Sequence, residues 1–237
     1  MIYPIDSVLS PTVDEVKLLI ADRDRKMQQD ILLLCQDDPW FWLVNFVRTV
    51  QKDEFSNGGL PVVQLFPAIP YLRIVFDGMF RHRKLVVDKS RQMILSWICM
   101  AYYLYWGLFG RHEQILIQTK KEEDAGNLVK RCFFMYENLR KWMKPKHTYR
   151  EGSGGRLCFP GRGSEIRGIP AGSGAADQIR SANPSRYFLD EGGFIDDFSG
   201  CRACAEACCG DIKIVSTPNV GAFANFVHDG EFEGTAA

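Results

Sequence analysis

The 237-residue sequence has no net charge, because 29 lysines and arginines balance 29 aspartates and glutamates. A chain without an overall basic excess lacks the composition that draws proteins to nucleic acid or to anionic membranes. Contact with DNA must therefore be local, or be supplied by another part of a longer protein. No basic start followed by an apolar run opens the chain, so no secretory signal is expected. The longest apolar run, Trp97 to Phe109, is shorter than the roughly 20 residues that span a bilayer and is predicted to be a core helix.

The sequence also has few cysteines at the spacing that is typical of metal ligands. The eight cysteines include the cluster CRACAEACC, Cys201 to Cys209, which holds one Cys-x-x-Cys pair and no histidine. Its alanine, glutamate and arginine neighbours favour a helix with reduced, packed cysteines. A zinc or iron–sulfur site is the alternative.

The first 60 residues have the spacing of helices. Ser10-Pro11-Thr12 can begin one helix, and a second apolar cluster runs from Ile31 to Phe46. Residues 51–61, QKDEFSNGGLP, are polar and contain glycine, which predicts a loop. We therefore expect an N-terminal helical lid or subdomain over residues 1–60 and a core over residues 61–237.

Beyond residue 61, short apolar runs alternate with longer helical patterns. Helices are predicted over 92–109 and 122–143, and short strands at GRLCF and SEIRGIP. The main strands are predicted at 84–88, 113–119, 186–191 and 211–218. Strands separated by helices of this length indicate parallel pairing through crossover helices, and hence an α/β fold.

The stretch KLVVDKSRQMILSW, Lys84 to Trp97, places a polar turn between a strand and a helix. At such a turn helix N–H groups can bind an anion. Lys89 and Arg91 can supply charge and Ser90 a hydroxyl, while Ser96 lies where a Mg²⁺-bound hydroxyl is expected. No glycine occurs between Asp88 and Trp97. The alternative is a plain strand-to-helix turn with solvated charges.

Two further strand ends are polar. In SRYFLDEGGF, Asp190 can hold Mg²⁺ and Glu191 can act as the general base that activates water, although acidic pairs also occur in structural turns. In DIKIVSTPNV, Ser216, Thr217 and Asn219 can sense a γ-phosphate, or simply end the strand in a turn.

Upstream of these strands, LFPAIPYLR, Leu65 to Arg73, combines prolines and aromatics. Phe66, Pro67 and Tyr71 can form apolar faces of an adenine pocket. A hydrophobic packing segment is the alternative.

Taken together, these pieces resemble the large terminase subunit of tailed bacteriophages, the ATPase of the DNA-packaging motor. The resemblance rests on FPAIPYLR, KSRQM followed by SW, RYFLDE and STPN in this order, across roughly residues 40 to 220. It implies a P-loop NTPase of RecA-like (ASCE) fold, with a mostly parallel sheet flanked by helices and an N-terminal helical lid. KSRQM would be its Walker A region and RYFLDE its Walker B strand.

The resemblance also implies roles for single residues. Lys89, at the start of the loop, would be the phosphate-binding lysine, and Arg91 and Gln92 would line the same loop. Asp190 and Ser96 would hold Mg²⁺, and Glu191 would be the catalytic carboxylate. The remaining roles fall on the coupling motif Ser216-Thr217-Pro218, on ATP-binding Ser90 and Thr217, and on Phe66 and Tyr71 at the base.

These motors act as homo-oligomeric rings assembled from monomers, and an arginine supplied by a neighbouring subunit completes each site. Arg180 is the candidate for this finger, ahead of Arg162 and Arg167, and a surface salt bridge is its alternative. The resemblance implies double-stranded DNA, a capsid portal protein and a small terminase subunit as partners, in the host cytoplasm and without a membrane. Lys120, Lys121, Lys130 and Arg131, on or beside a predicted helix, are candidate DNA contacts. A simply solvated helix face is the alternative.

The sequence departs from the family in two respects. Ile94-Leu95-Ser96 stands where most relatives have Gly-Lys-Ser/Thr, and no second acidic constellation follows residue 220, so no nuclease domain is expected in this chain. Two other functions stay open. One is a fragment of a helicase-like DNA translocase, although the chain has no room for the second RecA-like domain. The other is a non-hydrolysing assembly or scaffold protein with a decayed phosphate loop.

Overall fold

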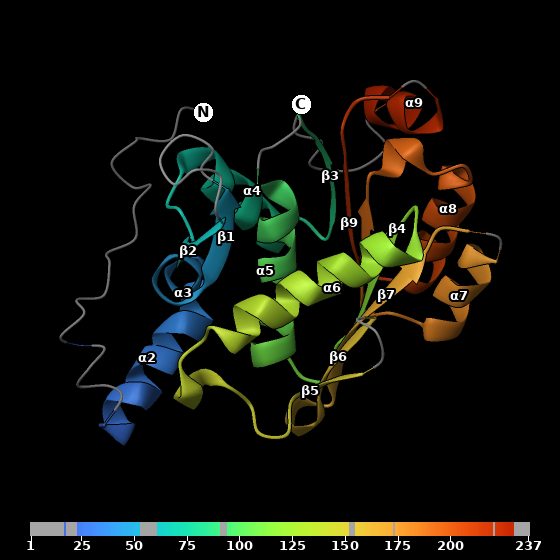
Figure 1. Ribbon diagram of the computed structural model, residues 1–237. Coiled ribbons are helices and arrows are strands. Elements are labelled where there is room, and N and C mark those ends of the chain that lie inside the picture. Colours follow the sequence, from blue (N-terminus) through green and yellow to red (C-terminus); the bar gives the residue numbers. More distant parts are fainter. Residues whose placement is uncertain are drawn as a thin grey trace.

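A seven-stranded sheet forms the centre of the molecule (Figure 1). The computed structural model describes residue 17 and residues 23–52, 61–90, 94–151, 155–172, 174–219 and 221–229. The strand order is β3-β9-β8-β4-β7-β6-β5. The first five strands pair in parallel, and β6 and β5 are antiparallel to their neighbours. Their bounds, in sheet order, are Lys84–Asp88, Asp211–Ser216, Arg186–Asp190, Gln114–Thr119, Ser164–Pro170, Arg156–Phe159 and Tyr149–Glu151. The predicted mostly parallel α/β sheet is confirmed.

Helices cover both faces of this sheet, which explains why its parallel strands are nearly continuous apolar runs. Of the helices in the described ranges, five lie over one face: α2 (Arg25–Asp37), α3 (Pro39–Phe46), α4 (Pro70–Arg81), α5 (Leu95–Phe109) and α6 (Glu122–Glu137). Three cover the other: α7 (Ala175–Ala182), α8 (Phe198–Cys208) and α9 (Ala222–Asp229). The apolar run predicted as a core helix is α5, most of which is buried. No helix in the described part of the chain has the length and apolar character needed to cross a membrane.

The N-terminal helices share a core with α4 and α5. Asp38 caps α3 by accepting a hydrogen bond from the Phe41 N–H at 2.9 Å, and Trp42 then packs edge-on against Tyr105 of α5, with 5.5 Å between ring centroids. The helix predicted near residues 10–20 lies almost wholly outside the described residues.

The region predicted as a loop over 51–61 is partly an antiparallel pair, β1 (Arg48–Lys52) and β2 (Pro61–Leu65). This pair crosses residue 60, where the sequence suggested a division. The described part of residues 1–60 therefore joins the rest of the chain through backbone pairing as well as through the shared core.

The cysteine cluster lies on α8, as its alanine-rich context predicted. All eight cysteines of the chain are unpaired, and Cys201, Cys204 and Cys209 are buried in the core between α8 and the sheet. Within the described ranges, no group of three or more His, Cys, Asp or Glu side chains is placed to hold a metal ion.

An ionic cluster lies under the amino-terminal ends of the parallel strands. Arg186 of β8 bonds to Glu113 at 3.1 Å, pairs with Asp211 and stacks on Trp106, whose ring centroid is 3.5 Å from the guanidinium carbon. Lys213 is 1% exposed in β9 and donates to the His82 carbonyl at 2.8 Å. These contacts satisfy charges that would otherwise be costly to bury.

A short helical turn, η2 (Lys141–Met143), follows α6, and a second one, η3 (Pro160–Arg162), joins β6 to β7. A third, η4 (Gly192–Phe194), follows β8 and leads into α8.

Candidate functional site

Three polar strand ends meet at the carboxyl-terminal edge of the sheet because β9 lies between β3 and β8. Asp88 at the end of β3 is in register with Ser216, and Asp190 at the end of β8 with Val215. The Lys89 N–H donates to the Ser216 carbonyl at 2.9 Å, which joins the end of β3 to β9. Ligands of parallel α/β sheets bind at such an edge, so this is the candidate site.

Glu191 lies at the centre of the site. Its Oε1 is 3.2 Å from Lys89 Nζ, and its Oε2 accepts a hydrogen bond from the Thr217 hydroxyl at 3.1 Å. Glu191 follows β8 in the left-handed backbone region, with φ of 55°, which turns its side chain away from the strand direction. The Glu191 side chain is 39% exposed whereas that of Lys89 is 9% exposed. Residues from two neighbouring strand ends thus orient one carboxylate that solvent can still reach.

Asp190 lies deeper than Glu191. The residue is 8% exposed, and its buried Oδ1 has no hydrogen-bond partner among the described residues. Burial, followed by the negative charge of Glu191, raises the pKa of Asp190 to about 6, while Lys89 and Arg131 act in the opposite direction. A buried carboxylate oxygen without a donor fits a hard cation such as Mg²⁺, which binds oxygen ligands.

The segment after Glu191 is fastened to the end of β9. The Gly193 N–H donates to the Ser216 hydroxyl at 2.9 Å, and the Asn219 side chain donates to the Gly193 carbonyl at 2.7 Å. A Cβ on Gly193 would approach the Ser216 hydroxyl to 3.0 Å, which is closer than most side-chain contacts. Movement of the polar end of β9 would therefore be transmitted to the backbone beside Glu191.

Arg131 of α6 is a residue whose role the sequence did not reveal. It was a candidate DNA contact, but the structure turns it inward, with its guanidinium carbon 5.4 Å from the Trp97 ring centroid on α5. Burial lowers its pKa, the charge of Asp190 opposes this, and Arg131 forms no ion pair with the described residues. In the sequence, the only hint of this inward direction was an aromatic residue, Trp97, in the first turn of α5. A partly buried cation beside Asp190 adds positive charge near the candidate site.

Asp88 is a second residue of this edge that was not predicted from the sequence as part of the site. Its Oδ1 is buried without a hydrogen-bond partner in the described ranges, and it lines a hollow with Pro218, Asn219 and Phe223. Its position directly before Lys89, at the end of a predicted strand, could have identified it.

The predicted phosphate turn is described in part. Ser90 is exposed after β3, and Ser96 is half-buried in the first turn of α5. Ile94 precedes α5 with φ of 56°, so this turn reaches the left-handed region without glycine. Arg91 and Gln92 lie outside the described residues.

The two aromatic residues predicted for the adenine pocket, Phe66 and Tyr71, differ in their burial. Phe66 is 2% exposed within the hydrophobic core, so in this structure its ring has no face available to a base. Phe66 thus has the packing that the alternative describes, and its contact with a base stays a prediction. Tyr71 is half-buried on α4 against the same core, and its contact with a base stays a prediction.

Arg180 does not contact this site in its own chain. Its side chain on α7 is 64% exposed, lies 3.3 Å from Asp177 and donates to the Cys204 sulfur at 3.4 Å. These are the contacts of the salt-bridge alternative, and a role in a neighbouring subunit stays a prediction.

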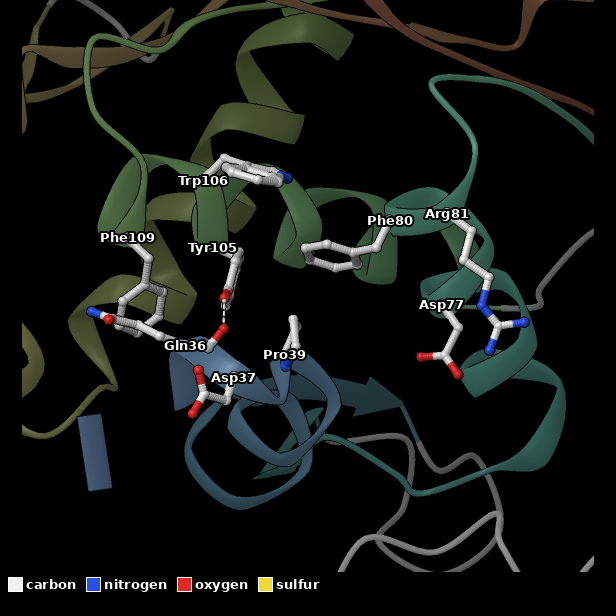
Figure 2. A pocket seen from close by; sticks show the side chains of 9 residues that line it. All are labelled: Gln36, Asp37, Pro39, Asp77, Phe80, Arg81, Tyr105, Trp106 and Phe109. Atoms are coloured by element: carbon white, nitrogen blue, oxygen red, sulfur yellow. Dashed lines mark hydrogen bonds between the residues drawn. The ribbon is translucent and has the colours of Figure 1, made fainter. Parts of the chain in front are cut away.

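A separate pocket of about 590 Å³ lies at the other end of α5. Figure 2 shows the side chains that line it. Tyr105, Trp106 and Phe109 of α5 face the α2–α3 junction, where the Tyr105 hydroxyl donates to the Gln36 carbonyl at 2.9 Å. The length of α5 separates this pocket from Ser96, so it does not belong to the site at the strand ends.

Comparisons with known proteins give likeness at the level of structure. No family model matches the sequence, and no curated protein matches it. A variant of the large terminase ATPase domain of Thermus phage P74-26 is similar over 69% of this chain and 72% of its own, with a TM-score of 0.55 and 19% identity. The large terminase of bacteriophage HK97 is similar over 70% of this chain but 37% of its own, with a TM-score of 0.54 and 17% identity. The chain therefore has the fold of large terminase ATPase domains.

Proposed function

We propose that this chain is the ATPase domain of a viral DNA-packaging motor, in which ATP hydrolysis drives double-stranded DNA into a procapsid. Support comes from the fold shared with large terminase ATPase domains. The observation that carries the proposal is the carboxylate of Glu191, held between Lys89 and Thr217 at the ends of three adjacent strands. Such an arrangement suits a general base positioned beside a phosphate site.

In the proposed reaction, Lys89 releases Glu191 and binds the phosphate oxygens of ATP. Glu191 then keeps its bond to Thr217 and accepts the proton of the attacking water. Asp190, with its unpartnered Oδ1, and Ser96 would hold Mg²⁺, whose charge offsets that of the β- and γ-phosphates. Ser90 and the loop that contains Arg91 and Gln92 would complete the contacts to the phosphates.

The proposed coupling step uses the end of β9. Because Ser216 and Asn219 hold the backbone of Gly193, a shift of the Ser216-Thr217-Pro218 segment upon loss of the γ-phosphate would reposition the residues after β8. The partners we propose are the DNA duplex, a portal protein, a small terminase subunit and further copies of this chain in a ring, in the host cytoplasm.

The test separates ATP binding from ATP hydrolysis. Glu191→Gln is expected to bind a fluorescent ATP analogue but to lose about a hundredfold or more in turnover, the usual range for a general base. Lys89→Ala is expected to lose both binding and turnover, because it removes the phosphate cation. Lys26→Ala and Glu137→Gln, at exposed positions on α2 and α6, are matched controls that should behave as wild type.

Turnover is measured with Mg²⁺ and duplex DNA at high protein concentration. If the wild type binds the analogue but never hydrolyses ATP, even with portal protein present, the chain is the non-hydrolysing assembly protein that the glycine-free loop suggests. Unchanged turnover in either Lys89→Ala or Glu191→Gln would refute the assignment of that residue.

The intersubunit role of Arg180 has a separate test. Arg180→Ala and Glu191→Gln proteins, each inactive alone, should recover part of the turnover when mixed, because some interfaces then combine an intact Glu191 with an intact Arg180. Failure of the mixture to recover turnover would remove Arg180 from this role.

A further inference from the structure

The segment after α6, residues 138–150, has a composition unlike the rest of this neutral chain. It contains five lysines and arginines, one histidine and no acidic residue. Three of the cations, Lys141, Lys146 and Arg150, are exposed. The segment runs from the end of α6 to β5 along the amino-terminal edge of the sheet, opposite the site at the strand ends (Figure 1).

Further cations lie beside this segment. η3 packs against it, since a Cβ on Gly161 would lie 3.6 Å from the Lys146 carbonyl oxygen. The carbonyl of Arg162 in η3 accepts the His112 N–H at 2.9 Å, which brings Arg111 to the same edge. We call residues 138–150 together with Arg111 and Arg162 the basic edge.

Acidic groups also lie near the basic edge, and most of them are paired with other arginines. Glu151 and Glu165 both pair with Arg156, and Glu113 pairs with Arg186. Arg156 offsets only one of its two glutamates, and the exposed Glu137 ends α6 directly before the segment. The lysines and arginines of the basic edge outnumber these carboxylates, so the edge stays positive.

A hollow of about 600 Å³ opens at one end of the basic edge, lined by Arg48, Arg140 and Lys141. The amide side chains of Gln28 and Asn138 also line it, and none of the described residues that line the hollow carries a carboxylate. Neither Arg48 nor Lys141 forms an ion pair with the described residues. This set of groups suits a phosphate group.

We propose that the basic edge and this hollow bind the sugar-phosphate backbone of double-stranded DNA; this inference rests on the proposed function. Tyr149 is the only large aromatic side chain of the basic edge that stands out as exposed among the described residues. The edge therefore lacks the series of stacking rings that holds single strands, whereas cations spread along it suit phosphates of a duplex.

The position of the basic edge also connects it to the candidate site. α6, with 16 residues and a length of about 24 Å, carries Arg131 near Trp97 and Asp190, and its last turn leads directly into the basic edge. Displacement of α6 when the site changes its ligand would move the DNA-binding cations.

The structure argues against the lysines that the sequence first suggested for DNA. Lys120 lies 3.8 Å from Asp196, and the first turn of α6, next to Lys121, contains Glu122, Glu123 and Asp124. Local charge near these lysines is thus negative, although the lysines themselves are exposed.

The experiment compares two triple variants that lose the same charge. Lys141→Ala/Lys146→Ala/Arg150→Ala removes three cations of the basic edge, and Lys120→Ala/Lys121→Ala/Lys130→Ala is the matched control. Fluorescence anisotropy with a labelled 30-bp duplex is measured without nucleotide from 50 to 200 mM NaCl. We expect the first variant to bind about tenfold or more weakly and its slope of log K against log salt to fall by about 2.7, at 0.9 per lost phosphate contact. The control should follow the wild type.

Thermal unfolding of both variants checks that the fold is retained. Equal losses in the two variants, or a loss confined to the control, would overturn the proposal. Retention of an acidic peptide such as oligoglutamate in place of the duplex would identify a protein partner instead and would also overturn it. Because binding is measured without ATP, a wild type that binds DNA but does not hydrolyse ATP would contradict the proposed ATPase and leave the basic edge intact.

Discussion

Replacing Asp190 by asparagine should stabilise the ligand-free protein at neutral pH. The pKa of Asp190 is raised from its ordinary 3.8 to about 6, mainly by burial. A pKa difference of about 2 corresponds to about 3 kcal/mol, at 1.36 kcal/mol per unit, as the cost of ionising this carboxyl in the folded protein. Asparagine is neutral at every pH and removes this cost. The gain in stability is reduced by about 1 kcal/mol, because the buried amide is imperfectly hydrogen-bonded.

The sign of the pH dependence follows from the raised pKa. Between pH 4 and pH 6 the folded protein binds more protons at Asp190 than the unfolded chain does, so the stability of the wild type falls as the pH rises through this window. The advantage of Asp190→Asn should therefore be about 2 to 3 kcal/mol at pH 7.5 and shrink to about 1 kcal/mol or less at pH 4.5.

Urea unfolding of wild type and Asp190→Asn in EDTA, at pH 7.5 and pH 4.5, measures this difference. Asp196→Asn is the matched control, because the Asp196 side chain is 94% exposed and should change stability little. Added Mg²⁺ should stabilise the wild type and not Asp190→Asn. The reasoning is refuted if Asp190→Asn is the less stable protein at pH 7.5 in EDTA, or if its advantage is the same at both pH values.

Three further predictions concern other parts of the structure. Arg131→Ala should slow ATP turnover and raise the pKa of Asp190 above about 6, seen by carboxyl NMR titration, whereas Arg131→Lys should retain part of the turnover; an unmoved Asp190 pKa would show that the two charges do not interact. Arg186→Ala should cost about 3 kcal/mol in urea unfolding, because Glu113 loses its ion pair and Asp211 keeps only that with Lys213, and a loss under 1 kcal/mol would contradict this. Gly107→Ala should cost about 1 to 3 kcal/mol, because its Cβ would lie 2.6 Å from a phenylalanine ring, while Gly210→Ala, with open space, should be nearly neutral; equal effects of both would argue against the close packing.

Much of the fold could be predicted from local patterns. The strands β3, β8 and β9 are apolar runs that end in polar residues, and the apolar run of α5 has no charged side chain to expose. Each of these patterns is complete within a short window, since burial on both faces requires a run of apolar side chains. The pairing of β1 with β2 was not predicted, because it depends on partners separated by the polar residues between them.

Only part of the candidate site could be predicted from such local patterns. Lys89, Asp190 and Glu191 are each recognisable from the strand that precedes them, and the strand order then brings them to one edge. The surroundings of Phe66 and Arg131 could not be predicted, because the direction of a side chain depends on neighbouring elements. Phe66 packs in the core, and Arg131 is drawn inward over Trp97.

By itself the sequence determined which segments become buried strands and core helices, and which polar residues follow those strands. These properties depend on side-chain polarity and local spacing. Only the tertiary structure decided that β9 lies between β3 and β8, and hence that Thr217 and Lys89 hold Glu191 together. It also decided where charges gather: Arg156 pairs with Glu151 and Glu165, and beside them lie the more numerous cations of the basic edge, in a chain of no net charge. Electrostatic pairing depends on distance in space, and distance in space is set by the packing of the whole sheet.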